Sequence, residues 1–200
     1  MDAAPVIDTL RSAVPGATFE ATASADMPTL YVDAANLTAT LRALRDDPAL
    51  QFALLSDITA VDRHPATPRF EIVYHLACLG AAYASGTPAP ARRLRLKVAL
   101  DGDAPRIASA VPVYPTANWL EREVFDLFGV SFEGHPDLRR ILTPEDWTGY
   151  PLRKDYPVQI RKTAESWSPI QLSAEEFAEN IRVQREGAAR QSRKTGPAGD

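Results

Sequence analysis

Two segments near the start of the chain repeat hydrophobic side chains at helical spacing. In residues 5–13, apolar positions recur every three or four residues until Pro15 and Gly16 interrupt the pattern. In residues 36–45, three leucines recur in the same way, and two aspartates followed by Pro48 end the segment. Each segment is therefore predicted to be an amphipathic helix with one face in a core.

Five further segments have the length and composition of β-strands. Two early ones are short and are separated by turn-forming residues. A third is a brief apolar run, and the last two alternate apolar with polar side chains, which is typical of strands with one buried face. The predicted strands are residues 18–22, 29–32, 52–55, 69–77 and 94–100.

The order helix, two strands, helix, three strands predicts an α+β fold in residues 1–110. A two-layer domain, with a mixed β-sheet and its helices on one face, lets the apolar sides of helices and sheet share a core. We expect residues 111–157 to form an amphipathic helix and then an extended segment rich in proline and arginine. Residues 78–92 have the composition of a variable loop insertion. Residues 158–200 are expected to be a tail that is partly helical, beginning near Ser173, or disordered unless it docks on partners.

The predicted helix of the middle region begins near Asn118 and ends at Gly129. Asn118 and Glu121 have the spacing of an N-terminal capping pair, and glycine commonly terminates helices. Four apolar side chains form one stripe of this helix. Glu121, Arg122 and Asp126 are expected on the other side, with Arg122 and Asp126 spaced for an ion pair.

The segment of residues 134–157, called the strap below, carries four prolines and several basic residues. Proline fixes the backbone and removes a hydrogen-bond donor, so we expect an extended path with bends. Arginine pairs well with carboxylates, and Arg, Trp and Tyr are enriched where proteins contact each other. The acid-rich helix and the basic strap are therefore expected to bind partners. The candidate contact residues are Glu121, Arg122, Glu123, Asp126, His135, Arg139, Arg140, Trp147, Arg153, Lys154, Asp155 and Tyr156.

Charge and cysteine content exclude several classes of function. The formal net charge of -4 gives no general attraction for nucleic acid. The longest nearly apolar stretch, residues 72–84, is too short to cross a bilayer. Cys78 is the only cysteine, which excludes an internal disulfide, a four-cysteine zinc site and an iron–sulfur cluster held by this chain alone. The first residues lack the pattern of a signal or transit peptide, and we expect a bacterial cytoplasmic protein.

A catalytic interpretation of the acidic helix is also open. Glu123 and Asp126 lie three residues apart, as carboxylates do in helical dimetal sites, and His135 could add a ligand or a base. A stand-alone metal-dependent hydrolase would use these three residues. The chain offers few further ligands, which favours ion pairs with nearby arginines instead. Nucleic-acid binding, which would use Arg139, Arg140, Arg153 and Lys154, is disfavoured by the acidic net charge.

Fixed spacings connect the acidic helix to the strap. The pattern comprises Glu121-Arg122-Glu123, Asp126-Leu127-Phe128, His135, Arg139, Ile141-Leu142, Asp146-Trp147, Gly149 and the run of residues 151–157. This pattern resembles the signature of the C subunit, the 30 kDa subunit family, of the proton-pumping NADH:quinone oxidoreductase, respiratory complex I. The resemblance covers about half of the chain well and does not extend to its two ends.

The resemblance implies a structural and assembly subunit without a catalytic centre of its own. Such a protein belongs to the peripheral arm on the cytoplasmic side of the bacterial inner membrane, and it contacts the membrane only through the complex. The implied partners are the cluster-bearing B subunit and the D subunit of the quinone cavity. FMN and the iron–sulfur clusters are implied to lie on other subunits, so no cofactor is expected here. The equivalent subunit of a related membrane-bound hydrogenase or ferredoxin-dependent complex is the alternative.

Overall fold

The computed structural model describes residues 3–24, 26–80 and 91–157, and four residues of the tail. The chain divides into two compact units, Met1–Pro157 and Val158–Asp200, so the region of the acidic helix and the strap is grouped with the sheet. The four described residues of the second unit are Ser173, Glu175, Glu179 and Arg182.

The described residues of the second unit include a helical segment. Glu175, Glu179 and Arg182 are helical, and Arg182 Nη2 lies 2.8 Å from Glu179 Oε1. They fall where a helix beginning near Ser173 is predicted. The rest of the predicted tail, and most of the predicted insertion at residues 78–92, lie outside the described residues.

The first unit contains three α-helices, a short 3₁₀ helix and seven strands among its described residues. The predicted order helix, two strands, helix, three strands is present, and the elements after it are a short strand, a helix and another short strand. The elements are α1 (Ala4–Ala13), β1 (Phe19–Thr22), β2 (Thr29–Val32), η1 (Ala34–Asn36), α2 (Leu37–Asp46), β3 (Leu54–Asp62), β4 (Phe70–Cys78), β5 (Arg92–Leu100), β6 (Arg106–Ala108), α3 (Ala117–Phe128) and β7 (Ser131–Glu133).

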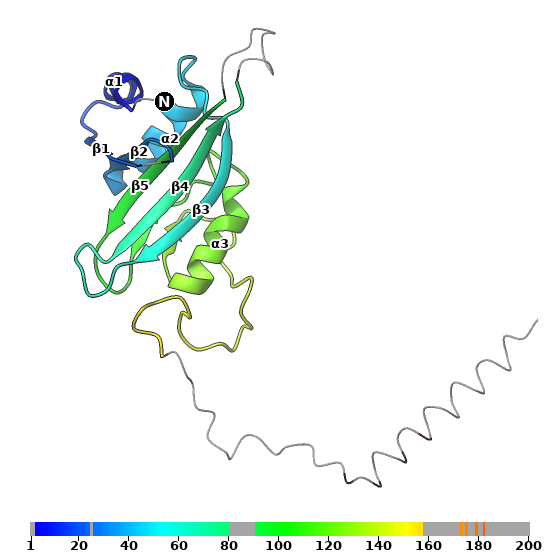
Figure 1. Ribbon diagram of the computed structural model, residues 1–200. Coiled ribbons are helices and arrows are strands. Elements are labelled where there is room, and N and C mark those ends of the chain that lie inside the picture. Colours follow the sequence, from blue (N-terminus) through cyan, green and yellow to red (C-terminus); the bar gives the residue numbers. More distant parts are fainter. Residues whose placement is uncertain are drawn as a thin grey trace, which may run out of the picture. The chain divides into compact units, whose positions relative to one another are not determined.

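Five strands form one mixed sheet in the order β1-β2-β5-β4-β3 (Figure 1). Its neighbours are antiparallel except for β2 and β5, which run parallel. The chain therefore leaves β2 in the interior of the sheet and reaches the far edge, β3, by way of η1 and α2. The short strands β6 and β7 pair in parallel as a separate ribbon, with Ile107 opposite Phe132.

One face of the sheet forms the core together with all three helices. The register places Tyr74 of β4 beside Leu96 on one side and Ile58 on the other, and all three side chains are buried. Side chains of α1, α2 and α3, such as Leu41 and Val124, belong to the same cluster. Burial of each large apolar side chain stabilises the fold by about 1.5–3 kcal/mol. The predicted two-layer arrangement with helices on one face is confirmed.

The other face of the sheet is polar at its centre. Glu71 accepts hydrogen bonds from Tyr31 Oη at 2.6 Å, Lys97 Nζ at 3.0 Å and Arg63 Nη2 at 2.8 Å. These residues alternate along β2, β4 and β5 with the buried ones, as expected for an antiparallel pair with one solvated face. The alternation explains why the two long central strands were predictable.

The prediction of a strand at residues 52–55 was wrong in its bounds, because β3 runs from Leu54 to Asp62. Phe52 lies before the strand, and its carbonyl accepts a hydrogen bond from Tyr114 Oη at 2.7 Å. The register shifts between Leu55 and Asp57, so the alternation of buried and exposed positions is interrupted within the strand. A strand whose alternation of buried and exposed positions is interrupted is difficult to predict from its sequence pattern.

The predicted end of the acidic helix is confirmed, and its predicted start is corrected. Gly129 follows α3 with φ of 74°, a left-handed conformation that favours glycine. The cap residue at the other end is Thr116, without a side-chain hydrogen bond, and Asn118 lies inside the helix. Asn118 and Glu121 therefore do not form the predicted capping pair, because Glu121 turns into the core instead.

Candidate functional site: α3 and the strap

Glu121 lies inside the protein and not on an outer polar face of α3. Its side chain is 0 % exposed, and it accepts hydrogen bonds from Ser109 Oγ at 2.7 Å and from the Ala110 amide at 2.5 Å. Burial raises the pKa of Glu121 to about 7, against the opposing effect of these two donors. The expectation that Glu121 lies on the polar side of the helix was wrong, because the 109–110 segment covers it.

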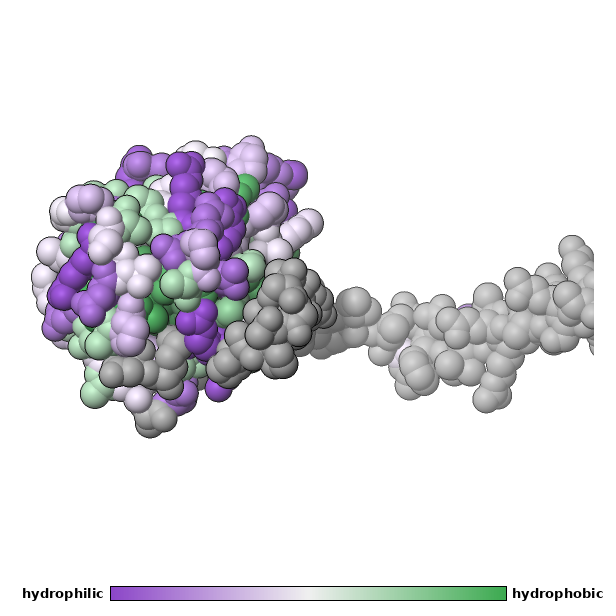
Figure 2. All heavy atoms as spheres, turned by 90° about the horizontal axis from the view of Figure 1, so that it is seen from above, coloured by the Kyte–Doolittle hydropathy of each residue, from purple (hydrophilic) through white to green (hydrophobic). Residues whose placement is uncertain are grey.

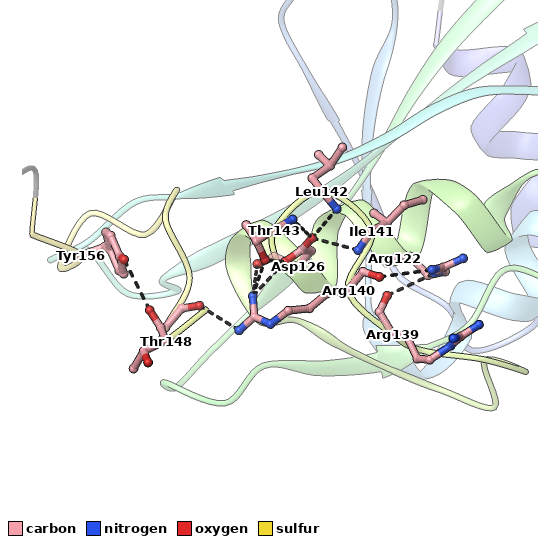
Figure 3. A network of polar contacts seen from close by, with 10 residues as sticks. Arg122, Asp126, Arg139, Arg140, Ile141, Leu142, Thr143, Thr148 and Tyr156 are labelled. Carbon is pink, nitrogen blue, oxygen red and sulfur yellow. Dashed lines mark hydrogen bonds and ion pairs between the residues drawn. The ribbon is translucent and has the colours of Figure 1, made fainter. Parts of the chain in front are cut away.

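Asp126 fastens the strap to α3. Its Oδ2 accepts hydrogen bonds from the backbone amides of Ile141, Leu142 and Thr143, at 2.9, 2.7 and 2.8 Å (Figure 3). Its Oδ1 accepts hydrogen bonds from Arg140 Nη1 at 2.8 Å and from the hydroxyl of Thr143. Burial alone would raise the pKa of this carboxyl, but the hydrogen bonds hold it well below its usual range. Asp126 is therefore an ionised, fully satisfied anchor.

Arginines of the strap and of α3 hold the two segments together. Arg140 contacts Asp126 and donates to the carbonyl of Gly149 at 3.0 Å. Arg122 of α3 donates to the carbonyls of Arg139 and Arg140, at 3.1 and 3.2 Å (Figure 3). The predicted ion pair between Arg122 and Asp126 was wrong, because Arg140 takes the place of Arg122 beside the carboxylate.

The far end of the strap is tied to the sheet. Arg153 Nε donates to the carbonyl of Phe128 at 2.6 Å, and the amide of Lys154 donates to Asp62 Oδ2 at 2.8 Å. Arg69 forms ion pairs with Asp62 and with Asp155, at 3.0 and 2.9 Å. Because Asp62 ends β3, these contacts join the strap to the end of the large sheet.

His135 is held with both ring nitrogens in use. Its Nδ1 accepts a hydrogen bond from the amide of Asp137 at 3.0 Å, and its Nε2 lies 3.1 Å from the carbonyl of Asn118. An accepting Nδ1 and a donating Nε2 correspond to a neutral imidazole. The histidine therefore fixes the turn into the strap against the start of α3.

The alternative interpretation, a metal site with Glu123, Asp126 and His135, has no support among the described residues. Within residues 3–24, 26–80 and 91–157, no group of three or more histidine, cysteine, aspartate or glutamate side chains could hold a metal ion. Asp126 and His135 are engaged by the strap, and Glu123 is exposed. Of the described helices, none is long and apolar enough to cross a membrane.

The twelve predicted contact residues fall into three groups. Two are fully buried, namely Glu121 and Asp126. Five are partly buried, namely Arg122, His135, Arg140, Arg153 and Tyr156, the last with its hydroxyl 3.4 Å from the Thr148 carbonyl. Five are exposed, namely Glu123, Arg139, Trp147, Lys154 and Asp155. The two buried carboxylates cannot touch a partner in this conformation, and the other ten stay candidates.

Sequence reasoning missed two kinds of residue. Asp62 and Arg69 hold the strap, but they lie more than eighty residues before the strap residues that they contact, and only the fold brings them together. Trp119 and Leu142 are 62 % and 61 % exposed and flank the place where the strap crosses α3. A signal for Trp119 was present, because a large apolar residue outside the apolar stripe of a helix is unusual.

Comparison with known proteins gives one consistent family. Residues 30–162 match the profile of the family described as "Respiratory-chain NADH dehydrogenase, 30 Kd subunit". The C subunit of the NADH-quinone oxidoreductase of Saccharopolyspora erythraea is 50 % identical over 131 residues, which are 65 % of this chain and 49 % of the relative. The corresponding C subunit of a Roseiflexus species is 38 % identical over 174 residues, covering 87 % of this chain and 95 % of the relative.

Two further matches extend the comparison. A protein of Gluconacetobacter diazotrophicus, named as the C/D subunit of NADH-quinone oxidoreductase, is 45 % identical over 142 residues, which are 68 % of this chain and 22 % of the relative. A solved structure, the trypsin-resistant fragment of Nqo5, is 29 % identical with a TM-score of 0.54, and it covers 69 % of this chain and 100 % of the fragment. The chain spans about half the length of the first of these curated relatives.

Proposed function

The chain belongs to the family of the 30 kDa subunit of respiratory-chain NADH dehydrogenase, and from this we propose that it is a structural subunit of a proton-translocating NADH–quinone oxidoreductase. In this proposal the chain carries no catalytic centre. FMN and the iron–sulfur clusters that pass electrons from NADH to quinone lie on other subunits. The single cysteine supports this, because it cannot hold a cluster by itself.

The observation that carries the proposal is the position of the family match relative to the strap. The match at residues 30–162 includes α3 and the whole strap. In that region Asp126, one of the two acids with a catalytic interpretation, holds the strap through the amides of residues 141–143. A surface segment fixed this firmly suits a contact role better than catalysis, since binding then costs less conformational entropy.

We place the protein in the peripheral arm, on the cytoplasmic side of the bacterial inner membrane, in contact with the membrane only through the complex. Its proposed neighbours are the cluster-bearing B subunit and the D subunit of the quinone cavity. The relative named as a C/D subunit supports proximity to the D subunit. The proposed contacts are made by the exposed residues of the predicted set, such as Glu123, Arg139, Trp147 and Lys154.

Deletion and complementation of the gene test this function. We expect membranes of the deletion strain to lose NADH-dependent quinone reduction, and the wild-type gene to restore it. NADH oxidation with an artificial acceptor serves as the control, since it needs only the flavin-bearing part of the complex. A deletion strain that retains full NADH-dependent quinone reduction would show the proposal to be wrong. Loss of a hydrogen- or ferredoxin-dependent activity instead would point to the alternative complexes.

A further inference from the structure

Exposed apolar side chains gather on α3 and the strap. Seven large apolar residues are exposed in the described part of the chain, and four of them lie here. These four are Trp119 at 62 %, Leu142 at 61 %, Leu152 at 49 % and Trp147 at 39 %. Exposed apolar side chains that are concentrated in one region mark a surface that another molecule covers.

The opposite end of the unit looks different. Figure 2 views the molecule from above Figure 1, away from the strap, and hydrophilic and hydrophobic residues there are mixed in small patches. The other three exposed large apolar residues, Leu54, Val61 and Leu79, lie on or beside β3 and β4. Four of the seven exposed large apolar residues in the described part of the chain therefore lie on α3 and the strap.

The apolar residues are held in place by the body of the protein. The Arg122 guanidinium stacks on Trp119, with 5.3 Å from Cζ to the ring centre, and hydrogen-bonds the strap where it crosses α3. The amide of Leu142 is bonded to the buried Asp126. The amide of Trp147 closes a turn on the Pro144 carbonyl at 3.0 Å. The Trp119 and Leu142 side chains, which flank the place where the strap crosses α3, are thus held on a fixed backbone.

The charged groups of this surface differ in whether they have a partner. Arg140 and Arg153 are directed inward, toward Asp126 and the carbonyl of Phe128, and Lys154 is exposed at the far end of the strap. Arg139 is exposed, but its charge is paired with Asp137 through two contacts of 2.7 Å. Glu123, Glu145 and Asp146 are exposed, and in the described part of the chain they make no hydrogen bond or ion pair.

We therefore define the strap face as Trp119, Glu123, Leu142, Glu145, Asp146 and Trp147, a set of three apolar residues and three carboxylates. Arg122 stacks on Trp119 beside this face, and Arg139 is paired with Asp137. We propose that the strap face docks a segment of a neighbouring protein subunit that combines apolar side chains with lysines or arginines. The proposal rests on the proposed function, because it assumes that the chain works inside a complex.

The carboxylates and apolar side chains of the strap face favour a partner segment that is both basic and apolar. A carboxylate covered by a partner loses water, and only a cation or a strong donor in the partner offsets that cost. Anionic lipid and nucleic acid are repelled by the three carboxylates, and an acidic protein segment is repelled in the same way. A purely apolar segment would leave all three charges buried without partners. A basic and apolar segment satisfies both features of the surface.

Carboxylate footprinting of the assembled complex tests the proposal. The complex and the separately purified chain are labelled with a carbodiimide and glycine ethyl ester, and labelling of each acid is measured by mass spectrometry. We expect labelling of Glu123, Glu145 and Asp146 to fall about fivefold or more in the complex. Glu20, an exposed acid on β1, is the control and should keep its labelling. Equal labelling of the three acids in the complex and in the separate chain overturns the proposal.

Charge reversal tests which kind of partner covers the face. The triple variant Glu123→Lys, Glu145→Lys, Asp146→Lys should be retained in the complex about tenfold less after a salt wash than the control Glu20→Lys. Circular dichroism of both variants checks that they fold. Equal retention, or zero-length cross-links from these acids to a second copy of this chain, overturns the proposal. If the wild-type chain joins no NADH-oxidising complex, the proposed function fails; if it joins one with the strap face uncovered, only the present proposal fails.

Discussion

Two buried carboxylates on α3, Glu121 and Asp126, illustrate how environment sets the state of the same chemical group. Neither side chain is exposed to solvent. Glu121 has two donors, so burial dominates and the pKa is raised to about 7. Asp126 has three amides, a hydroxyl and an arginine around it, and its pKa is held low. The larger number of donors around Asp126, an arginine among them, keeps its pKa low, whereas desolvation dominates at Glu121.

The Glu121 environment predicts a pH dependence of stability. The folded-state pKa of about 7 lies above the ordinary value of 4.5, so the folded protein binds a proton more tightly than the unfolded chain. Stability is then lost as the pH rises between these values, by on the order of 3 kcal/mol. The variant Glu121→Gln lacks this titration. We expect urea unfolding at a series of pH values to show the wild type losing stability relative to Glu121→Gln as the pH rises from about 4 to about 8.

A constant difference between the two proteins over that range would contradict the raised pKa. The variant Glu20→Gln is a control, because Glu20 is exposed on β1 and its removal should leave the pH profile unchanged.

Asp126 predicts a strong and local effect of mutation. The variant Asp126→Asn removes the negative charge from a buried pair with Arg140, and we expect a cost of about 3–5 kcal/mol. The lowered pKa means that this stabilisation is present above the ordinary value of 3.8 and is lost only as the pH falls toward the folded-state pKa. Hydrogen exchange should accelerate at the amides of residues 141–143.

The variant Asp137→Asn provides the comparison for Asp126→Asn. Asp137 also pairs with an arginine, but on the surface, where solvent screens the pair, and its loss should destabilise the fold far less than the loss of Asp126. If both variants cost the same, Asp126 does not anchor the strap.

At the scale of elements, Gly129 allows the end of α3 to pack closely against the strap. Gly129 has φ of 74°, and a Cβ atom built there would lie 2.6 Å from Cδ2 of Tyr150. The ring of Tyr150 cannot move aside easily, because the guanidinium groups of Arg140 and Arg153 stack on it, at 5.4 and 4.8 Å. The turn after α3 and the path of the strap therefore depend on each other.

This contact predicts that Gly129→Ala is costlier than a comparable glycine substitution elsewhere. Gly102 also has positive φ, 83°, but nothing lies within 4 Å of a Cβ atom there. Gly102→Ala should cost about 1–2 kcal/mol for the left-handed backbone. Gly129→Ala should cost a further 1–3 kcal/mol, approximately, for displacing Tyr150. Chemical denaturation measures the free energy of unfolding of the two variants. Equal losses would show that Tyr150 of the strap does not pack tightly against Gly129.

The elements that could be predicted are those with one face buried in the core, because burial of one face gives a regular pattern of apolar and polar residues. Residues 69–77 and 94–100 alternate because one face of the sheet is buried, and the leucines of α2 recur because one side of the helix meets that face. The strand β3 was cut short because its register shifts, and the three-residue strands β6 and β7 are too short to show any alternation.

The sequence predicts a contact region on α3 and the strap, which stays a prediction, but it does not predict which side chains of that region bind each other. The density of arginine and aromatic residues in the strap indicated a contact region. Which arginine meets Asp126 depends on how the chain returns over α3, and Arg140 rather than Arg122 reaches it. Glu121 was placed outside because a charged residue is usually exposed. Only the folded structure shows that the Ser109 hydroxyl and the Ala110 amide donate hydrogen bonds to Glu121.

At the scale of the whole molecule, the sheet, α3 and the strap form one unit that ends at Pro157. Among the residues that the structure describes, those of the core all lie before that point, and the strap is tied to the sheet by Asp62 and Arg69. The chain truncated after Pro157 should therefore fold, with a free energy of unfolding within about 1 kcal/mol of that of the full chain. Thermal or urea unfolding followed by circular dichroism measures this, and a truncated chain that does not unfold cooperatively would contradict it.

The central claim is that this chain is an integral structural subunit of an NADH–quinone oxidoreductase. The most direct measurement is to purify that enzyme from the host membranes by following its NADH-dependent quinone reduction, and to quantify this chain in the active fraction. The account predicts that the chain is present in equal amount to the subunits that carry the flavin and the clusters. A fully active, intact enzyme that lacks the chain would contradict it.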